Sequence, residues 1–396
     1  MAQKRTEAKH RDAEGLDVRA PEAVLASLAE AQIEAASAVR EAIPAIASAA
    51  ALIADRLNAG GKLVYAAAGS SGLMALADAL ELPGTFGIDR SRIAILIAGG
   101  QEAFQTLAGG PEDDEGEAAE AVEGANIGKN DCLIALSASG STPYAVRALL
   151  EAKRRGAATI AVANNGETPL LQAADVAILL KTPPEVIAGS TRMGAGTAQK
   201  IALNMLSTLA AIHLGHVHDG YMVNLLADNA KLRDRAARIV AAVTGRDRGD
   251  AERSLEMSGG AVKTAILLAA GATSVDAAEM MGVFRNNPQD VVEFTTNAKP
   301  GDFGGFAPKV FDYAAKGDAV ATWIVDKAVA DVEASLGVLG LEAGDPLCLL
   351  GGLAPLYAPR LSERHRALLK TPLDDALGGA VRMAVRMFAA PVEAAR

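Results

Sequence analysis

The stretch that decides the fold is KLVYAAAGSSGLMALADAL, residues 62–80. After Lys62, the next six residues form an apolar run of the length of one buried strand. The next four, GSSG, are typical of a turn, and the remainder has the apolar spacing of a helix. Further strands are expected at RIAILIAGG (92–100), DCLIALSASG (131–140), ATIAVAN (158–164) and DVAILLK (175–181). Apolar strands alternating with helices predict an α/β fold with a doubly wound parallel sheet that is buried on both faces.

The sequence on either side of this sheet divides the chain into four expected parts. Residues 1–58 contain two Ala-rich helices within 21–57, the first opened by Pro21 and the two separated at Pro44. The sheet domain follows at 59–245, and its pattern becomes wholly helical from Gly196 to about Val243. The other two parts are a small helical segment at 246–283 and a last segment at 284–396.

The last segment begins with a stretch rich in Pro, Gly and Asn near 284–306, which predicts a boundary. A long helix is expected over Pro308–Leu336, a strand over PLCLLGG (346–352) and a final helix over Asp374–Phe388. One clear strand in about a hundred residues is too few for a complete α/β domain. The pattern therefore predicts only part of such a domain.

Composition excludes several classes of partner. The formal net charge is -10 and aromatic residues make up 4% of the chain, so neither a nucleic acid nor an anionic membrane surface is an expected partner. The polar N-terminal stretch does not resemble a signal peptide, and the apolar pattern Ala198–Leu214 is shorter than a bilayer span. We therefore expect a soluble cytoplasmic protein. Cys132 and Cys348 are expected as reduced thiols in the core, and the spacing of the histidines in HLGHVHDG (213–220) does not predict a metal site.

Three loops rich in Gly, Ser and Thr are candidates for binding a phosphate group. They are AAGSSGL (67–73), SASGSTPY (137–144) and AGSTRMGAGTAQK (188–200), and each precedes a helix. Ligands of parallel sheets lie beyond the carboxyl ends of the strands, and the N-terminus of a helix there favours anions. Ordinary helix caps and turns use the same residues, but three such loops in one domain favour a small sugar phosphate. The hydroxyl donors expected to take part are Ser70, Ser71, Ser137, Ser139, Ser141 and Thr142.

Two carboxylates are candidates for acid and base chemistry. Glu81 is expected just after the helix opened by GSSG, at the helix C-terminus, where a negative charge is unfavourable for the helix. Glu112 begins the acidic run EDDE, whose other members are expected on the solvated surface. Each glutamate alone is also compatible with a surface position. Two carboxylates that face one pocket would supply the general acid and general base that chemistry on a sugar requires.

Longer segments resemble a known family. GGKLVYAAAGSSG, DALELPGTFG, GGPEDDEG, SASGSTPYAV and above all STRMGAGTAQKIALNMLST are similar to the N-acetylmuramic acid 6-phosphate etherases, members of the sugar-isomerase (SIS) superfamily with a Rossmann-like fold. The resemblance implies a lyase without metal or organic cofactor, which converts N-acetylmuramic acid 6-phosphate into N-acetylglucosamine 6-phosphate and D-lactate. It also implies a homodimer, because sites of this family are completed across subunits.

The same resemblance assigns the site residues. The two catalytic glutamates of the family correspond to Glu81 and Glu112, of which we expect Glu112 to be the base and Glu81 the acid. In the family's mechanism the sugar ring opens, a carboxylate removes the C2 proton, lactate leaves C3, and water adds to the unsaturated aldehyde. Further substrate-binding residues expected from the matching segments are Glu185, Ser190, Thr191, Arg192 and Lys200. Arg192 and Lys200 are also compatible with roles as helix-end or surface charges.

Two features leave a second hypothesis open. The family has an arginine in two of its loops where this chain has Leu73 and Ser141. In addition, DYAAKGDAVATWIVDKAV, CLLGGLAPLYAPRL and PLDDALGGAVRMA resemble the C-terminal end of the BadF/BadG-type sugar kinases, such as N-acetylglucosamine kinase. The alternative is therefore a non-catalytic sugar-phosphate sensor that regulates a kinase, like the glucokinase regulatory protein. A ketose–aldose isomerase, a third possibility, does not explain the STRMGAGTAQK match.

Overall fold

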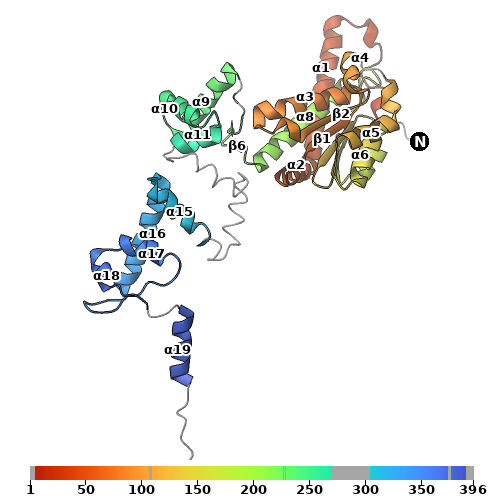
Figure 1. Cartoon of the computed structure of the whole chain (residues 1–396). Helices are drawn as coiled ribbons and strands as arrows, with labels where there is room; N and C mark the ends of the chain where they lie inside the picture. The colour runs from red at the N-terminus through yellow and green to blue at the C-terminus, as the bar shows by residue number, and fades with distance from the viewer. Residues whose placement is uncertain are drawn as a thin grey trace, which may run out of the picture. The chain divides into compact units, whose positions relative to one another are not determined.

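A five-stranded parallel sheet forms the centre of the first part of the chain (Figure 1). Each strand is an apolar run that ends in a loop rich in small residues, as the sequence predicts. The strands are β1 (Leu63–Ala67), β2 (Ile93–Ile97), β3 (Cys132–Ser137), β4 (Ala158–Ala163) and β5 (Val176–Leu179). They lie side by side in the order β2-β1-β3-β4-β5. The expected α/β fold with a parallel sheet is confirmed.

The computed structural model describes residues 5–106, 109–225, 227, 229–269, 304–372 and 376–388. Two compact units divide the chain, and among the described residues the first extends to Ile266 while the second begins at Leu267. The predicted boundary near 284–306 lies mostly outside the described residues, and the four predicted domain ranges stay predictions.

Helices cover both faces of the sheet. Alternate strand residues such as Tyr65 and Ile134 pack on one face, and their neighbours such as Val64 and Leu133 pack on the other. The first face is covered by α2 (Ile43–Asn58), α3 (Gly69–Phe86) and α8 (Gly194–His213), and the second by α5 (Glu115–Gly124), α6 (Pro143–Arg154) and α7 (Pro169–Ala173). The doubly wound arrangement is therefore confirmed.

Two helices precede the sheet, as expected. α1 (Pro21–Ser37) and α2 are joined by a short 3-10 turn at Ala38–Ala42, and Pro44 lies in the first turn of α2. Among the described residues, Pro21–Asn58 has the length and apolar composition of a membrane span. Core helices of soluble proteins meet the same criteria, and α2 buries six side chains, among them Ile46 and Ile53, against the sheet.

Two local predictions in this unit are wrong. GSSG is the first turn of α3 rather than a separate turn, and the helix continues through Pro83 to Phe86, where Gly87 adopts a left-handed φ of 63° and ends it. Glu81 therefore lies inside the helix and not after it. The stretch expected as wholly helical contains a hairpin, β6 (Val217–His218) and β7 (Tyr221–Met222), before α9 (Ala230–Thr244). Asp219 and Gly220 both have positive φ, the geometry of a two-residue hairpin turn.

Beyond α9, the chain continues with helices α10 (Arg248–Met257) and α11 (Val262–Ala269), which agree with the start of the expected helical segment. The rest of that segment, 270–283, lies outside the described residues.

The described part of the second unit is helical. The helix expected over Pro308–Leu336 is divided into α15 (Ala307–Ala315) and α16 (Ala319–Val338), because Gly317 has a φ of 86° and Asp318 caps the second helix. The remaining helices are α17 (Ala354–Tyr357), α18 (Glu363–Leu368) and α19 (Ala376–Phe388).

The strand expected over 346–352 is wrong, and the described part of this tail is helical rather than part of an α/β fold. Within the described residues of the tail, the β pairing is a single bridge between Leu347 and Leu369. Cys348 is exposed, whereas the buried Cys132 agrees with the expectation of a core thiol. The resemblance of the tail to a sugar kinase stays a prediction.

Candidate active site

The site is built at the point of the sheet where the strand order reverses. The chain passes from β1 outward to β2 and then crosses to β3 on the other side of β1. Ala67 is in register with Leu136, so the loops that follow β1 and β3 begin about 5 Å apart. Crevices at such switch points are where open α/β sheets bind ligands.

The first loop of the site is the start of α3. Gly69 has a left-handed φ of 53°, which turns the chain from β1 into the helix. The first intrahelical bond runs from the Gly72 N–H to the Ala68 carbonyl at 3.1 Å. The N–H groups of Gly69, Ser70 and Ser71 therefore have no acceptor within the helix, and the positive end of the helix dipole lies there. This loop is suited to a phosphate group.

The second loop, 137–142, is held together by its own hydroxyl groups. Ser137 Oγ lies 2.8 Å from Thr142 Oγ1 and 3.2 Å from Ser139 Oγ, and it accepts the Gly140 N–H at 3.0 Å. Ser139 Oγ in turn accepts the N–H and the hydroxyl of Ser141. The four predicted hydroxyl groups of this loop thus form one network at the carboxyl end of β3, before the first turn of α6.

Glu112 brings a carboxylate to the first loop. It lies in a short 3-10 turn, Gly110–Asp113, in the connection between β2 and α5. Its Oε1 is so close to Gly69 that a Cβ atom on that residue would lie only 2.6 Å away. Glu112 is half-buried, and no hydrogen bond reaches its carboxylate from the residues that the structure describes. Burial, and to a smaller extent the charge of Asp113, raises the pKa of Glu112.

The third loop, 188–193, lies at the same edge and leads into α8. Glu185 just before it is buried, and its carboxylate accepts the N–H groups of Gly194 and Ala195 at 2.9 and 2.8 Å, which caps α8. Ser190 and Thr191 form turns within the loop. Arg192 is exposed, and among the described residues it has no hydrogen bond or ion pair. Its guanidinium is therefore available to an anion.

Glu81 and Lys200 lie away from this edge. Glu81 is exposed on α3, twelve residues after Gly69, which corresponds to about 18 Å along the helix. Lys200 Nζ donates to Asn204 on α8 at 2.8 Å. One copy of the chain therefore brings Glu112 to the Ser and Thr loops but does not bring Glu81 to Glu112. The substrate-binding and catalytic assignments themselves stay predictions.

The sequence analysis missed a buried polar cluster beside Glu81. Asp78 on α3 accepts the Tyr65 hydroxyl at 2.8 Å and the Ser207 hydroxyl at 3.0 Å. Burial raises the pKa of Asp78, and the negative charge of Glu81 adds to this rise. The two hydrogen bonds and the positive charge of Lys200 lower the pKa and offset part of the rise. The aspartate in the otherwise apolar run LMALADAL was the available signal. The cluster fixes α3 between β1 and α8, one turn from Glu81.

Comparisons with known proteins identify the family. Residues 29–164 match the SIS domain family. An N-acetylmuramic acid 6-phosphate etherase from Deinococcus radiodurans is 46% identical over 265 residues, which cover 67% of this chain and 87% of that protein. Another from Symbiobacterium thermophilum is 50% identical over 59% of this chain and 78% of its own length.

Among solved structures, a phosphoheptose isomerase from Francisella tularensis aligns with a TM-score of 0.38 and 22% identity over 49% of this chain and 99% of its own. The etherase relatives are far more similar in sequence, and most of their length is covered. The chain belongs to the N-acetylmuramic acid 6-phosphate etherase family.

Proposed function

We propose that this protein is a carbon–oxygen lyase that cleaves the D-lactyl ether of N-acetylmuramic acid 6-phosphate and releases N-acetylglucosamine 6-phosphate and D-lactate. The observation that carries this proposal is the half-buried Glu112 carboxylate at the donor-rich start of α3. A general base and a phosphate-binding helix N-terminus are thereby combined at one edge of the sheet. The identity to curated etherases supports the substrate.

The phosphate group would be bound by neutral donors and one arginine. The N–H groups of Ser70 and Ser71 and the hydroxyl network of 137–142 supply the donors. This chain has Leu73 and Ser141 at the two positions where the family has arginines, so a positive charge that neutralises the phosphate must come from another residue. Arg192 has no other partner among the described residues and lies in the neighbouring loop. We assign it to the phosphate or to the lactyl carboxylate.

The two glutamates would perform elimination and then hydration. After the ring opens to the aldehyde, the Glu112 carboxylate takes the C2 proton, the C3–O bond breaks, and Glu81 donates a proton to the departing lactate oxygen. In the second half, Glu81 takes a proton from the water that adds to C3, and Glu112, whose carboxyl proton has exchanged with the solvent in the meantime, protonates C2. Substrate and one water thus become two products. The raised pKa of Glu112 makes it a stronger base once ionised.

A homodimer would bring the two glutamates together. Within one copy Glu112 lies beside Gly69, and the part of α3 from Gly69 to Glu81 is about 18 Å long. An apolar groove of about 540 Å³ runs between α2 and α8 and is lined by Ile43, Ile46, Ile201, Asn204, Met205 and Ile212. Asn204 accepts the hydrogen bond of Lys200, whose charge acts on Asp78 beside Glu81. A second copy seated on this groove would therefore approach Glu81 and could present its own Glu112.

The reaction in heavy water tests the chemistry. Elimination and hydration in D2O should place one deuterium at C2 of the N-acetylglucosamine 6-phosphate, and water labelled with ¹⁸O should place its oxygen at C3. Lactate released without deuterium at C2 would contradict the elimination. Saturable binding of the substrate without any lactate release would instead favour the sugar-phosphate sensor.

A further inference from the structure

The segment at the start of the chain contacts the phosphate-binding edge. Thr6, which is only 3% exposed, forms hydrogen bonds to this edge through both its backbone and its side chain. Its N–H donates to Asn165 Oδ1 at 3.4 Å, its hydroxyl oxygen accepts from Asn165 Nδ2 at 3.0 Å, and its carbonyl accepts the Gly189 N–H at 3.1 Å. Asn165 follows β4, and Gly189 lies in the third loop of the site. Thr6 therefore joins two parts of the edge that are far apart in sequence.

Asn165 extends this connection to the second loop. Its side chain is buried, and Nδ2 also lies 3.2 Å from the Ala138 carbonyl and 3.4 Å from the Ser139 carbonyl, to which it donates. A carbonyl group and the N–H of the following residue belong to one planar, trans peptide unit and point in opposite directions. A hydrogen bond that holds the carbonyl therefore also fixes the direction of that N–H. Asn165 thus sets the direction of two peptide N–H groups, those of Ser139 and Gly140, in the loop that carries Ser137, Ser139 and Ser141.

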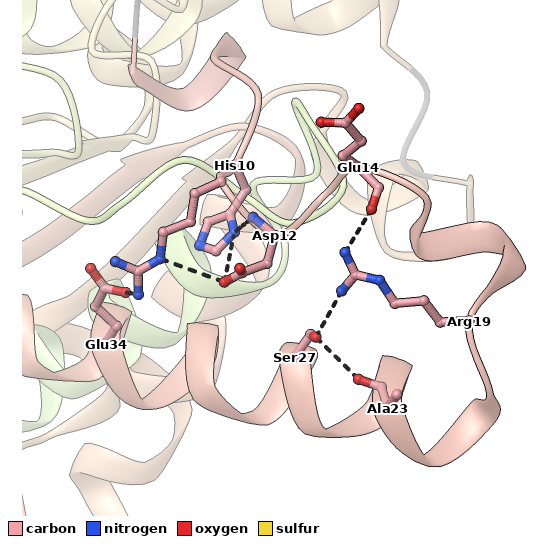
Figure 2. A network of polar contacts seen from close by, with 8 residues as sticks. His10, Asp12, Glu14, Arg19, Ala23, Ser27 and Glu34 are labelled. Carbon is pink, nitrogen blue, oxygen red and sulfur yellow. Dashed lines mark hydrogen bonds and ion pairs between the residues drawn. The ribbon is translucent and has the colours of Figure 1, made fainter.

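The rest of the N-terminal segment is anchored to α1, which keeps Thr6 in place. Leu16 packs against Ala31 of α1 and against Val186, next to the Glu185 that caps α8. Figure 2 shows the polar contacts of the same segment. The His10 ring accepts the Asp12 N–H at 3.0 Å, and Arg19 donates to the Ser27 hydroxyl of α1 at 3.3 Å and to the Glu14 carbonyl.

We propose that Thr6 and Asn165 are positioning residues of the sugar-phosphate site, and that the N-terminal segment, residues 6–19, forms one side of that site. Through Asn165, the Thr6 hydroxyl holds the 137–142 loop in the geometry that binds the phosphate group; through its carbonyl, Thr6 holds the 188–193 loop beside it. This inference rests on the proposed function and adds residues to its substrate site. A role limited to tethering the N-terminus would leave substrate binding unchanged when the hydroxyl is removed.

The test compares three variants of the full chain. Thr6→Val removes the hydroxyl and leaves Asn165 Nδ2 without that acceptor, and Thr6→Ser retains it. Thr159→Val is the matched control, because Thr159 is also a buried threonine and its hydroxyl donates to Asp175 at 2.8 Å, at the opposite end of strand β4. KM and kcat for D-lactate release are measured, together with the Kd for N-acetylglucosamine 6-phosphate and the melting temperature.

Thr6→Val should raise KM and the Kd about three- to tenfold, as expected for one lost hydrogen bond in a buried network, with kcat nearly unchanged. Thr6→Ser should match the unaltered protein, and Thr159→Val should lower the melting temperature without changing KM. If Thr6→Val does not fold, Thr6→Ala removes the same oxygen and provides the same comparison.

An unchanged KM and Kd in Thr6→Val, in a protein that releases lactate, would overturn this inference and leave the proposed function intact. An equal rise of KM in Thr159→Val would also overturn it, because the effect would then be general destabilisation. Failure of the unaltered protein to release lactate would instead count against the proposed function, and the Kd comparison would still test the role of Thr6.

Discussion

Two inactive variants of this chain should restore activity when they share a dimer. In one copy Glu112 lies beside Gly69, and twelve residues of α3, about 18 Å of helix, separate Gly69 from Glu81. In glycosidases, two carboxylates that act across one sugar lie roughly 5–10 Å apart. A site that uses both glutamates must therefore take one from each of two copies. Glu81→Gln and Glu112→Gln homodimers should each lose about 10²–10⁴ in rate.

A mixed dimer contains one chain of each variant and therefore two different sites. One site is intact, because it takes Glu81 from the Glu112→Gln chain and Glu112 from the Glu81→Gln chain. The other site lacks both glutamates. Random pairing of equal amounts makes about half of the dimers mixed, and each has one of its two sites intact. Co-expressed variants should thus recover about a quarter of the normal rate, a rise of more than tenfold over either variant alone.

The assay measures D-lactate with a coupled dehydrogenase after purification through two different tags, which isolates mixed dimers at about half of the normal activity per dimer. The control pairs Glu81→Gln with the doubly substituted chain, in which no site can be intact. Tagged mixed dimers with no more activity than this control would refute a site shared between the two copies.

Three further predictions concern Glu112 and the stability of the fold. Gly69→Ala would place a Cβ 2.6 Å from Glu112 Oε1 at a φ of 53°. It should lower kcat about 100-fold by displacing the base, with the circular dichroism spectrum unchanged; a normal kcat would count against the role of Glu112. Asp113→Asn removes a negative charge that raises the pKa of Glu112. Because the base then stays ionised to lower pH, the acid limb of kcat/KM should move to lower pH, whereas Glu115→Gln should leave it in place. Glu151 is held by Arg154 and Arg155, whose hydrogen bonds lower its pKa to about 2. Its stabilising effect is therefore present above the ordinary Glu value of about 4.3 and is lost as the pH falls through about 2. Glu151→Gln should lower the free energy of unfolding by about 1–3 kcal/mol at pH 7, and the difference from the unaltered chain, followed in urea, should shrink at acid pH.

Apolar runs and small-residue loops were sufficient to predict the sheet, because a parallel strand buried on both faces requires a continuous apolar sequence. The errors arose where one short pattern fits two structures. GSSG serves as a turn or as the first turn of a helix, and Pro83 did not end α3. In the tail, PLCLLGG is apolar like a strand but has a single bridging partner, Leu369, in the described residues.

The candidate site was predictable in so far as it follows from topology. Loops after adjacent parallel strands lie at one edge, which brings Ser70 and Ser137 together from their sequence positions alone. The contact of Glu112 with Gly69 and the link between Thr6 and Asn165 depend on the tertiary fold, since the latter pair is 159 residues apart. The separation of Glu81 from Glu112 depends on the length of α3, which the sequence pattern underestimated.

The most direct test is to incubate the purified, chelator-treated protein with N-acetylmuramic acid 6-phosphate in the absence of ATP and to measure both products over time. An etherase with Glu112 as its base should release D-lactate and N-acetylglucosamine 6-phosphate in equal amounts. Saturable binding of the substrate by the folded protein, with no lactate released, would contradict the proposed enzyme.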